Sequence, residues 1–99
     1  MISDVNIKHN TIMVYDSKGR RISAMSQGGK ELAGLTGEFF VIINNTIIEV
    51  YDEKCKKISR MAKGSRTVVS VAGDSFTTKK ADILEVYDRN CKRISYRSA

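Results

Sequence analysis

The chain has 99 residues, is 41% hydrophobic and 28% charged, carries a formal net charge of +6, and lacks proline and tryptophan. This length predicts one domain, and the apolar fraction excludes a wholly disordered chain. The N-terminal stretch MISDVNIKHN is neither a signal peptide nor a transit peptide, and no apolar run approaches the ~20 residues of a transmembrane helix. We therefore expect a cytoplasmic protein with two reduced cysteines and no membrane partner.

A nearly identical stretch occurs three times at a fixed spacing. VYDSKGRRIS begins at Val14, VYDEKCKKIS at Val50 and VYDRNCKRIS at Val86, so the period is 36 residues (50 − 14 = 36; 86 − 50 = 36). A repeat of this length indicates a stacked or radial architecture. We divide the single domain 1–99 into three units, which are an incomplete repeat 1 (1–28), repeat 2 (29–64) and repeat 3 (65–99).

Each complete repeat predicts four short strands. In chain order, repeat 3 supplies TVVSVA, DSFTTK, ILEVYD and KRISYR, which are rich in β-branched and aromatic residues and separated by Gly, Asn, Asp and Lys. Repeat 1 has no counterpart of the first of these strands. Helices are not expected, because no segment shows a sustained apolar period of 3.6 residues.

The third strand of each repeat is apolar on both faces. In repeat 2, Ile48 and Val50 point one way, and Ile47 and Tyr51 point the other. A strand that is buried on both sides belongs to a sheet lying between other sheets. We therefore expect most aromatic side chains to lie in the core, with only Tyr96 free; the expected core aromatics are Tyr15, Tyr51, Tyr87, Phe39, Phe40 and Phe76.

The strand is followed by a turn with its own chemistry. An aspartate at the end of the strand can accept a hydrogen bond from the backbone two residues on and so begin a turn; this residue is Asp16, Asp52 or Asp88. Gly19 occupies the place where such a hairpin needs a positive φ. Because Cys55 and Cys91 replace that glycine in the later repeats, we expect those two turns to be reshaped.

The pattern resembles a β-propeller blade. It reads Gly, Glu or Asp, any residue and Phe, then an apolar strand ending in Val-Tyr-Asp, then two basic residues and Ile. The tryptophan signatures of well-known blade families are absent, so no functional residue carries over. Propellers have 4–8 blades, and the resemblance therefore implies an all-β half-ring that closes by homo-oligomerisation, with a dimer favoured. The alternative is a β-prism or trefoil-like monomer with pseudo-threefold symmetry.

No catalytic or metal-binding pattern is visible, and no cofactor is implied. His9 is the only histidine, and neither cysteine belongs to a known nucleophile signature. Two cysteines and one histidine do not complete a zinc site. We expect Cys55 and Cys91 to remain unbridged, because equivalent hairpin tips of neighbouring repeats lie apart in a radial arrangement.

Basic residues gather where alternate turns of the meander meet. One end of the sheets is expected to hold the links between repeats and the turns between second and third strands, with Glu31 and Asp82 as its only acids. Its candidate ligand-binding residues are Lys8, His9, Lys30, Lys63, Arg66, Lys79 and Lys80. We expect a non-enzymatic module that binds an anionic ligand or an acidic protein partner. The alternatives are a nucleic-acid-associated protein and a small hydrolase.

Overall fold

The computed structural model describes residues 1–98, and these form three antiparallel sheets. Sheet 1 holds three strands, β1 (Asp4–Lys8), β2 (Thr11–Tyr15) and β3 (Arg21–Ser26). Sheet 2 holds four, β4 (Lys30–Leu35), β5 (Phe39–Asn44), β6 (Ile47–Asp52) and β7 (Lys57–Ala62). Sheet 3 repeats that arrangement with β8 (Thr67–Ala72), β9 (Ser75–Lys80), β10 (Ile83–Asp88) and β11 (Arg93–Ser98).

The predicted all-β fold of three meander repeats is confirmed. Within each sheet, every strand pairs with the next one along the chain, and all the pairings are antiparallel. In repeat 3 the predicted first and third strands coincide with β8 and β10, and the other two start one residue later than expected. Each sheet has the same register shift in the pairing of its last two strands, at Val14, Val50 and Val86, so the repeat extends to the irregularities of the backbone.

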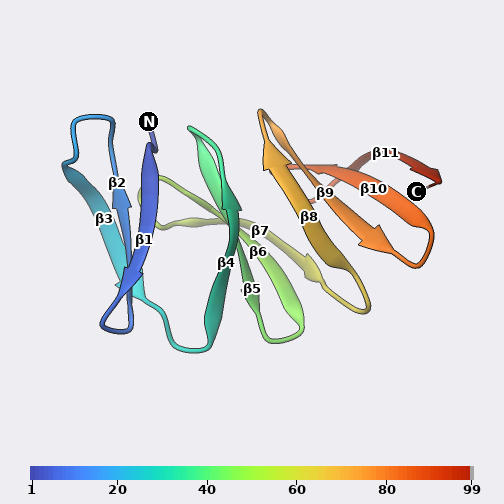
Figure 1. Ribbon diagram of the computed structural model, residues 1–99, viewed down its shortest axis with the longest axis horizontal. Helices are drawn as coiled ribbons and strands as arrows, with labels where there is room; N and C mark the ends of the chain where they lie inside the picture. Colours follow the sequence, from blue (N-terminus) through green and yellow to red (C-terminus); the bar gives the residue numbers. More distant parts are fainter. Residues whose placement is uncertain (99) are drawn as a thin grey trace.

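The sheets stand in a row along the longest dimension of a molecule that measures 40 × 25 × 19 Å (Figure 1). Sheet 2 lies between the other two, and sheets 1 and 3 lie at opposite ends. The first strands of sheets 2 and 3, β4 and β8, are the closest strands of different sheets. Gly34 permits this approach, because a Cβ added there would lie 2.6 Å from Cγ2 of Val71.

Each sheet has two distinct faces, which the chain direction defines. We call the face toward the next sheet the forward face and the face toward the preceding sheet the backward face. Ile12 and Val14 on the forward face of sheet 1 pack with Phe40 and Tyr51 on the backward face of sheet 2. One period later, the forward face of sheet 2 packs with the backward face of sheet 3 through residues that include Ile48, Val50, Phe76 and Tyr87. Sheet 2 is therefore buried on both faces, as the apolar third strand predicted.

The predicted aromatic core is confirmed, with one exception. Phe40 stacks on Tyr51 and Phe76 stacks on Tyr87, with ring centroids 5.5 and 5.6 Å apart. Tyr15 is only half-buried, contrary to the prediction. It lies on the backward face of sheet 1, which no other sheet covers within residues 1–98.

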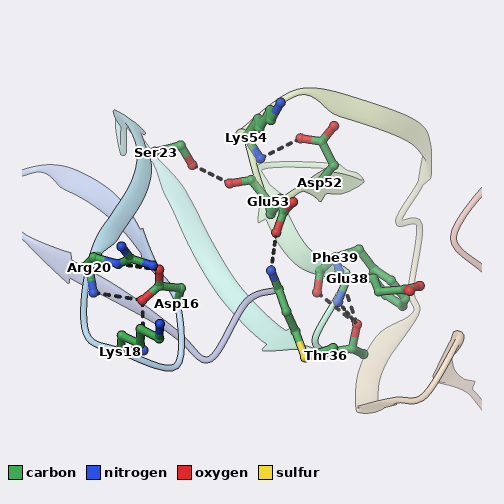
Figure 2. A network of polar contacts seen from close by, with 11 residues as sticks. Asp16, Lys18, Arg20, Ser23, Thr36, Glu38, Phe39, Asp52, Glu53 and Lys54 are labelled. Atoms are coloured by element: carbon green, nitrogen blue, oxygen red, sulfur yellow. Dashed lines mark hydrogen bonds and ion pairs between the residues drawn. The ribbon is translucent and has the colours of Figure 1, made fainter.

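The three turns that follow the VYD strands share one conformation. The amide nitrogens of Gly19, Cys55 and Cys91 donate to the carbonyl oxygens of Asp16, Asp52 and Asp88 at 3.0–3.1 Å. Each aspartate also accepts two backbone amides through Oδ1 (Figure 2 shows the turn of Asp16). The expected reshaping is wrong, because Cys55 and Cys91 keep φ values of 61° and 59°. The hydrogen bonds made by the aspartates compensate the strain of a left-handed non-glycine residue, which is roughly 1–2 kcal/mol.

Each cysteine turn is anchored to the preceding sheet by a serine. Ser23 of β3 donates through Oγ to the carbonyl of Glu53 at 2.6 Å (Figure 2), and the same Oγ lies 3.2 Å from Sγ of Cys55. Ser59 of β7 repeats both contacts in sheet 3, with the carbonyl of Arg89 and with Sγ of Cys91. The two thiols are free and contact serines of different sheets.

Candidate functional site

Alternate connections of the meanders share one edge of the row of sheets. In Figure 1 the β1–β2, β3–β4, β5–β6, β7–β8 and β9–β10 connections run along the lower edge. This is the edge on which the alternation of turns places the basic residues. We call it the basic edge.

The predicted site residues are spread along the basic edge rather than gathered in one place. Lys8 and His9 lie at the β1–β2 hairpin of sheet 1, and Lys30 begins β4 of sheet 2. Lys63 lies in the β7–β8 connection. These residues come from successive sheets along the row, so they do not form one binding site.

The remaining predicted residues belong to sheet 3, and the structure brings two of them together. Arg66 of the β7–β8 connection and Lys80 at the end of β9 line one cleft of about 300 Å³. Lys79 is adjacent to Lys80 in the strand and therefore points to the opposite, forward face. The full lining, which we call the basic cleft, consists of Arg66, Lys80, Ala81, Ile83, Glu85, Arg93 and Tyr96.

The basic cleft is built around a buried carboxylate. Glu85 of β10 is 7% exposed and accepts Nε of Arg66 at 3.1 Å and Nη1 of Arg93 at 3.3 Å. Burial alone would raise the pKa of Glu85, but the hydrogen bonds from the two arginines outweigh it and lower the pKa below its ordinary value. Glu85 is thus ionised at neutral pH and holds both guanidinium groups in place.

Three cationic side chains line the cleft that holds this single carboxylate. Arg66 also donates through Nη1 to the carbonyl of Ala62 at 3.4 Å, which ties the β7–β8 connection to the cleft. Lys80 is exposed, and no acidic side chain in residues 1–98 pairs with it. The cleft therefore carries a surplus of positive charge that Glu85 only partly balances.

Tyr96 adds the one large aromatic side chain that is exposed among the described residues, as the sequence predicted. It is 65% exposed, and the guanidinium carbon of Arg93 lies 4.8 Å from the centroid of its ring. This stacking places the cation beside a flat apolar surface. With Ile83, which is 45% exposed, Tyr96 gives the basic cleft an apolar side.

Sheet 2 also holds a buried carboxylate at the position of Glu85, but its partners are a lysine and a tyrosine instead of two arginines. Glu49, 36 residues before Glu85, is 3% exposed and accepts Nζ of Lys57 at 2.9 Å and the hydroxyl of Tyr51 at 3.0 Å. Burial opposes ionisation of Glu49, but these hydrogen bonds lower its pKa, whereas burial and the contact with Glu49 raise the pKa of Tyr51 to about 12. In sheet 1 the residue equivalent to Glu49 is Met13, whose Sδ accepts a hydrogen bond from the hydroxyl of Tyr15. The buried carboxylate is thus a shared structural device, and the arginines and Tyr96 are particular to sheet 3.

The opposite edge of the row holds a larger cleft with balanced charge. It measures about 490 Å³ and is lined by Met1, Gly37, Glu38, Asp52, Glu53, Lys54 and Lys56. Many of its charges already pair: the Met1 amine lies 2.7 Å from Oε2 of Glu53, and Arg89 bridges Glu38 and Asp74 nearby. Its three acids match its two lysines and the N-terminal amine, so this cleft carries no surplus of positive charge.

The structure offers no activated nucleophile in residues 1–98. Burial raises the pKa of the Cys55 and Cys91 thiols, so both stay protonated and weakly nucleophilic at neutral pH. His9 lies in an exposed hairpin turn with a φ of 53°. No group of three His, Cys, Asp or Glu side chains that could hold a metal ion is found in the same residues.

Comparisons with known proteins give no information on this site. The chain matches no protein-family model and no curated protein sequence. In the part of the chain that the structure describes, no helix is long and apolar enough to cross a membrane.

The sequence analysis did not identify the polar and aromatic residues Glu85, Arg93 and Tyr96 of the basic cleft as site residues. The candidate residues were chosen among the basic residues at the turns of the basic edge, whereas Glu85, Arg93 and Tyr96 lie within strands β10 and β11. A signal was present, because Glu49 and Glu85 recur at the period of 36 inside an otherwise apolar strand. A charged residue that recurs within a doubly buried strand needs a partner, and that requirement points to Lys57 and Arg93.

Proposed function

We propose that the protein is a non-enzymatic binding module whose basic cleft takes an anionic group, either from a small ligand or from an acidic protein partner. The observation that carries the proposal is the surplus of cations in the basic cleft, whose lining holds Arg66, Arg93 and Lys80 but only one carboxylate. The two arginines are pre-oriented by Glu85, so less side-chain entropy is lost on binding than with free surface lysines. Two free thiols fit a reducing compartment such as the cytoplasm.

The test is a binding titration with defined anions. Tripolyphosphate, a short polyglutamate peptide and a single-stranded oligonucleotide are added to the isotope-labelled protein, and NMR shifts are followed at Tyr96 and the Arg93 side chain. We expect saturable shifts at these residues that weaken as salt is raised. Shifts centred on Lys8 and His9, or binding that salt does not change, would contradict the proposal.

Two variants of equal charge change locate the site. Lys80→Glu alters an exposed side chain of the basic cleft, and Lys56→Glu alters an exposed lysine of the opposite edge. We expect Lys80→Glu to weaken anion binding about tenfold, and Lys56→Glu to change it by less than about twofold, since a fully formed charge contact is worth about 1.4 kcal/mol. Equal effects of both variants would mean that only the net charge matters.

The nucleic-acid alternative is separated by the same titration. The exposed ring of Tyr96 beside Arg93 could stack on one base, but a single aromatic side chain is a small platform for a single strand. We therefore expect the oligonucleotide to bind no more tightly than tripolyphosphate at equal charge. Tighter oligonucleotide binding that Tyr96→Ala removes would favour the nucleic-acid function instead.

A further inference from the structure

The row of sheets ends in two faces that no sheet covers within residues 1–98. They are the forward face of sheet 3 and the backward face of sheet 1. By the period of 36 residues, the forward face of sheet 3 is equivalent to the forward face of sheet 2, and the backward face of sheet 1 is equivalent to the backward face of sheet 2. Both faces of sheet 2 are packed inside the molecule. The repeat therefore shows what kind of surface each end face is shaped to meet.

The forward face of sheet 3 retains apolar residues at part of the packing positions. Leu84 and Val86 stand 36 residues after Ile48 and Val50, which are fully buried against sheet 3. Ile94 stands at the position of Ile58, which packs against the same core, yet it is 60% exposed. Leu84 and Val86 are partly exposed on the same face, so Ile94 is not an isolated apolar residue. Its position is used for packing in both preceding sheets, which makes this face a candidate contact surface.

The serine anchor extends the same register. Ser23 and Ser59 donate to the carbonyls of residues 30 positions later, in the turn of the following sheet. Ser95 is the third member of this series and is exposed on the last sheet. The acceptor that matches it by the repeat is the carbonyl of Ser17, beside Gly19, in the exposed turn of sheet 1.

Polar replacements on the forward face of sheet 3 suit a contact between separate chains. Thr77, Lys79 and Arg97 stand where sheet 2 has Val41, Ile43 and Met61. On the same face Ser75 replaces Phe39, and on the backward face of sheet 1 Asp4, Asn6 and Thr11 replace Phe40, Ile42 and Ile47. Interfaces between chains carry more polar groups than a domain core, and such a face also remains soluble when it is uncovered.

We propose that the forward face of sheet 3 docks on the backward face of sheet 1 in a second copy of this chain. Ser95 Oγ then donates to the carbonyl of Ser17 in the second copy, and Ile94 packs beside Gly19 and Tyr15 of that copy. Two copies form this contact twice and close a six-sheet ring that resembles a β-propeller, within the usual range of 4–8 sheets. The proposal is independent of the basic cleft, which lies on the backward face and basic edge of sheet 3.

The first test is the mass in solution by sedimentation equilibrium, from low micromolar to a few hundred micromolar protein. We expect a reversible shift from the chain mass of 11.1 kDa to twice that value. Ile94→Arg or Ser95→Arg, each at an exposed position of the forward face, should raise the dimer dissociation constant at least tenfold. Tyr96→Arg is the matched control, because the exposed neighbour on β11 points to the backward face and should leave dimerisation unchanged.

The second test separates this head-to-tail contact from a symmetric contact of sheet 3 with sheet 3. Asn6→Arg changes the backward face of sheet 1 and should also weaken self-association. A mixture of the Asn6→Arg chain with the Ile94→Arg chain keeps one intact contact and should form heterodimers. A symmetric contact predicts no such rescue.

Three results would overturn the proposal. The first is a monomer throughout the concentration range. The second is a dimer that Tyr96→Arg weakens as much as Ile94→Arg. The third is an oligomer in which the two mutant chains do not complement each other. Circular dichroism of each variant checks that the chain remains folded, and the mixture supplies an internal control because it contains the same two mutant chains.

Discussion

One buried side chain in the core has a hydroxyl group without a hydrogen-bond partner. Thr78 is 0% exposed, and its Oγ1 is the only buried side-chain polar atom without a hydrogen-bond partner in the described residues. It replaces Ile42, the residue 36 positions earlier, so the repeat itself shows that an apolar side chain fits there. We expect Thr78→Val to raise the free energy of unfolding by about 1–2 kcal/mol, because an unsatisfied hydroxyl is removed without a change of shape. Urea denaturation monitored by circular dichroism measures the change.

A second threonine provides the control for this substitution. Thr36 is 9% exposed, and its Oγ1 accepts the amides of Glu38 and Phe39. The same Thr-to-Val change there should lower the free energy of unfolding by about 1–3 kcal/mol, since two amides lose their acceptor. Destabilisation by Thr78→Val would mean that the Thr78 hydroxyl has a partner, such as a buried water.

At the scale of the strands, the approach of β4 to β8 depends on a residue without a side chain. A Cβ at position 34 would lie 2.6 Å from Cγ2 and 2.8 Å from Cβ of Val71, so sheets 2 and 3 would have to separate. Gly34→Ala should lower the free energy of unfolding by about 1–3 kcal/mol, the usual range for overpacking. Gly29→Ala is the control, because nothing lies within 4 Å of a Cβ added there. Guanidinium denaturation of both variants provides the comparison.

A double-mutant cycle tests whether the effect comes from this contact. Val71→Gly removes both clashing atoms but has its own cost in a strand. Combined with Gly34→Ala, it should cost less than the sum of the two single changes, with a coupling of about 1 kcal/mol. Additive effects would show that Gly34 matters for its backbone in the β4–β5 register shift and not for the approach to Val71.

The strands themselves could be predicted from the sequence, but their partners across the sheets could not. Alternation and turn residues placed β8 and β10 to the residue, because these signals are local. The predicted reshaping of the turns at Cys55 and Cys91 was wrong. The hydrogen bonds of the aspartates and the serine contact from the preceding sheet outweigh the local preference against a positive φ. The basic cleft was not predicted, because its residues are distant in the sequence. Arg66, Glu85 and Arg93 come from the β7–β8 connection, β10 and β11, and only the packing of sheet 3 brings them together.

At the scale of the whole molecule, burial is greatest in the middle of the row. β5 and β6 hold side chains that are 0% exposed on both faces, including Phe39, Phe40, Ile48 and Val50. β11 is exposed at every position. A row of units that contact only their neighbours is stabilised most where a unit has two neighbours.

Amide hydrogen exchange should follow this gradient. In dilute protein, below the concentration at which the proposed dimer forms, we expect the amides of β5 and β6 to exchange at least tenfold more slowly than the hydrogen-bonded amides of β11. The reason is that opening the last sheet exposes one interface, whereas opening the middle sheet exposes two. At high concentration the amides of β1–β2 and β10–β11 should slow, while those of β5 and β6 change little, since only the end faces gain a neighbour. Equal protection of all three sheets at dilution would show that the row unfolds as a single unit and that the end sheets need no partner to be stable.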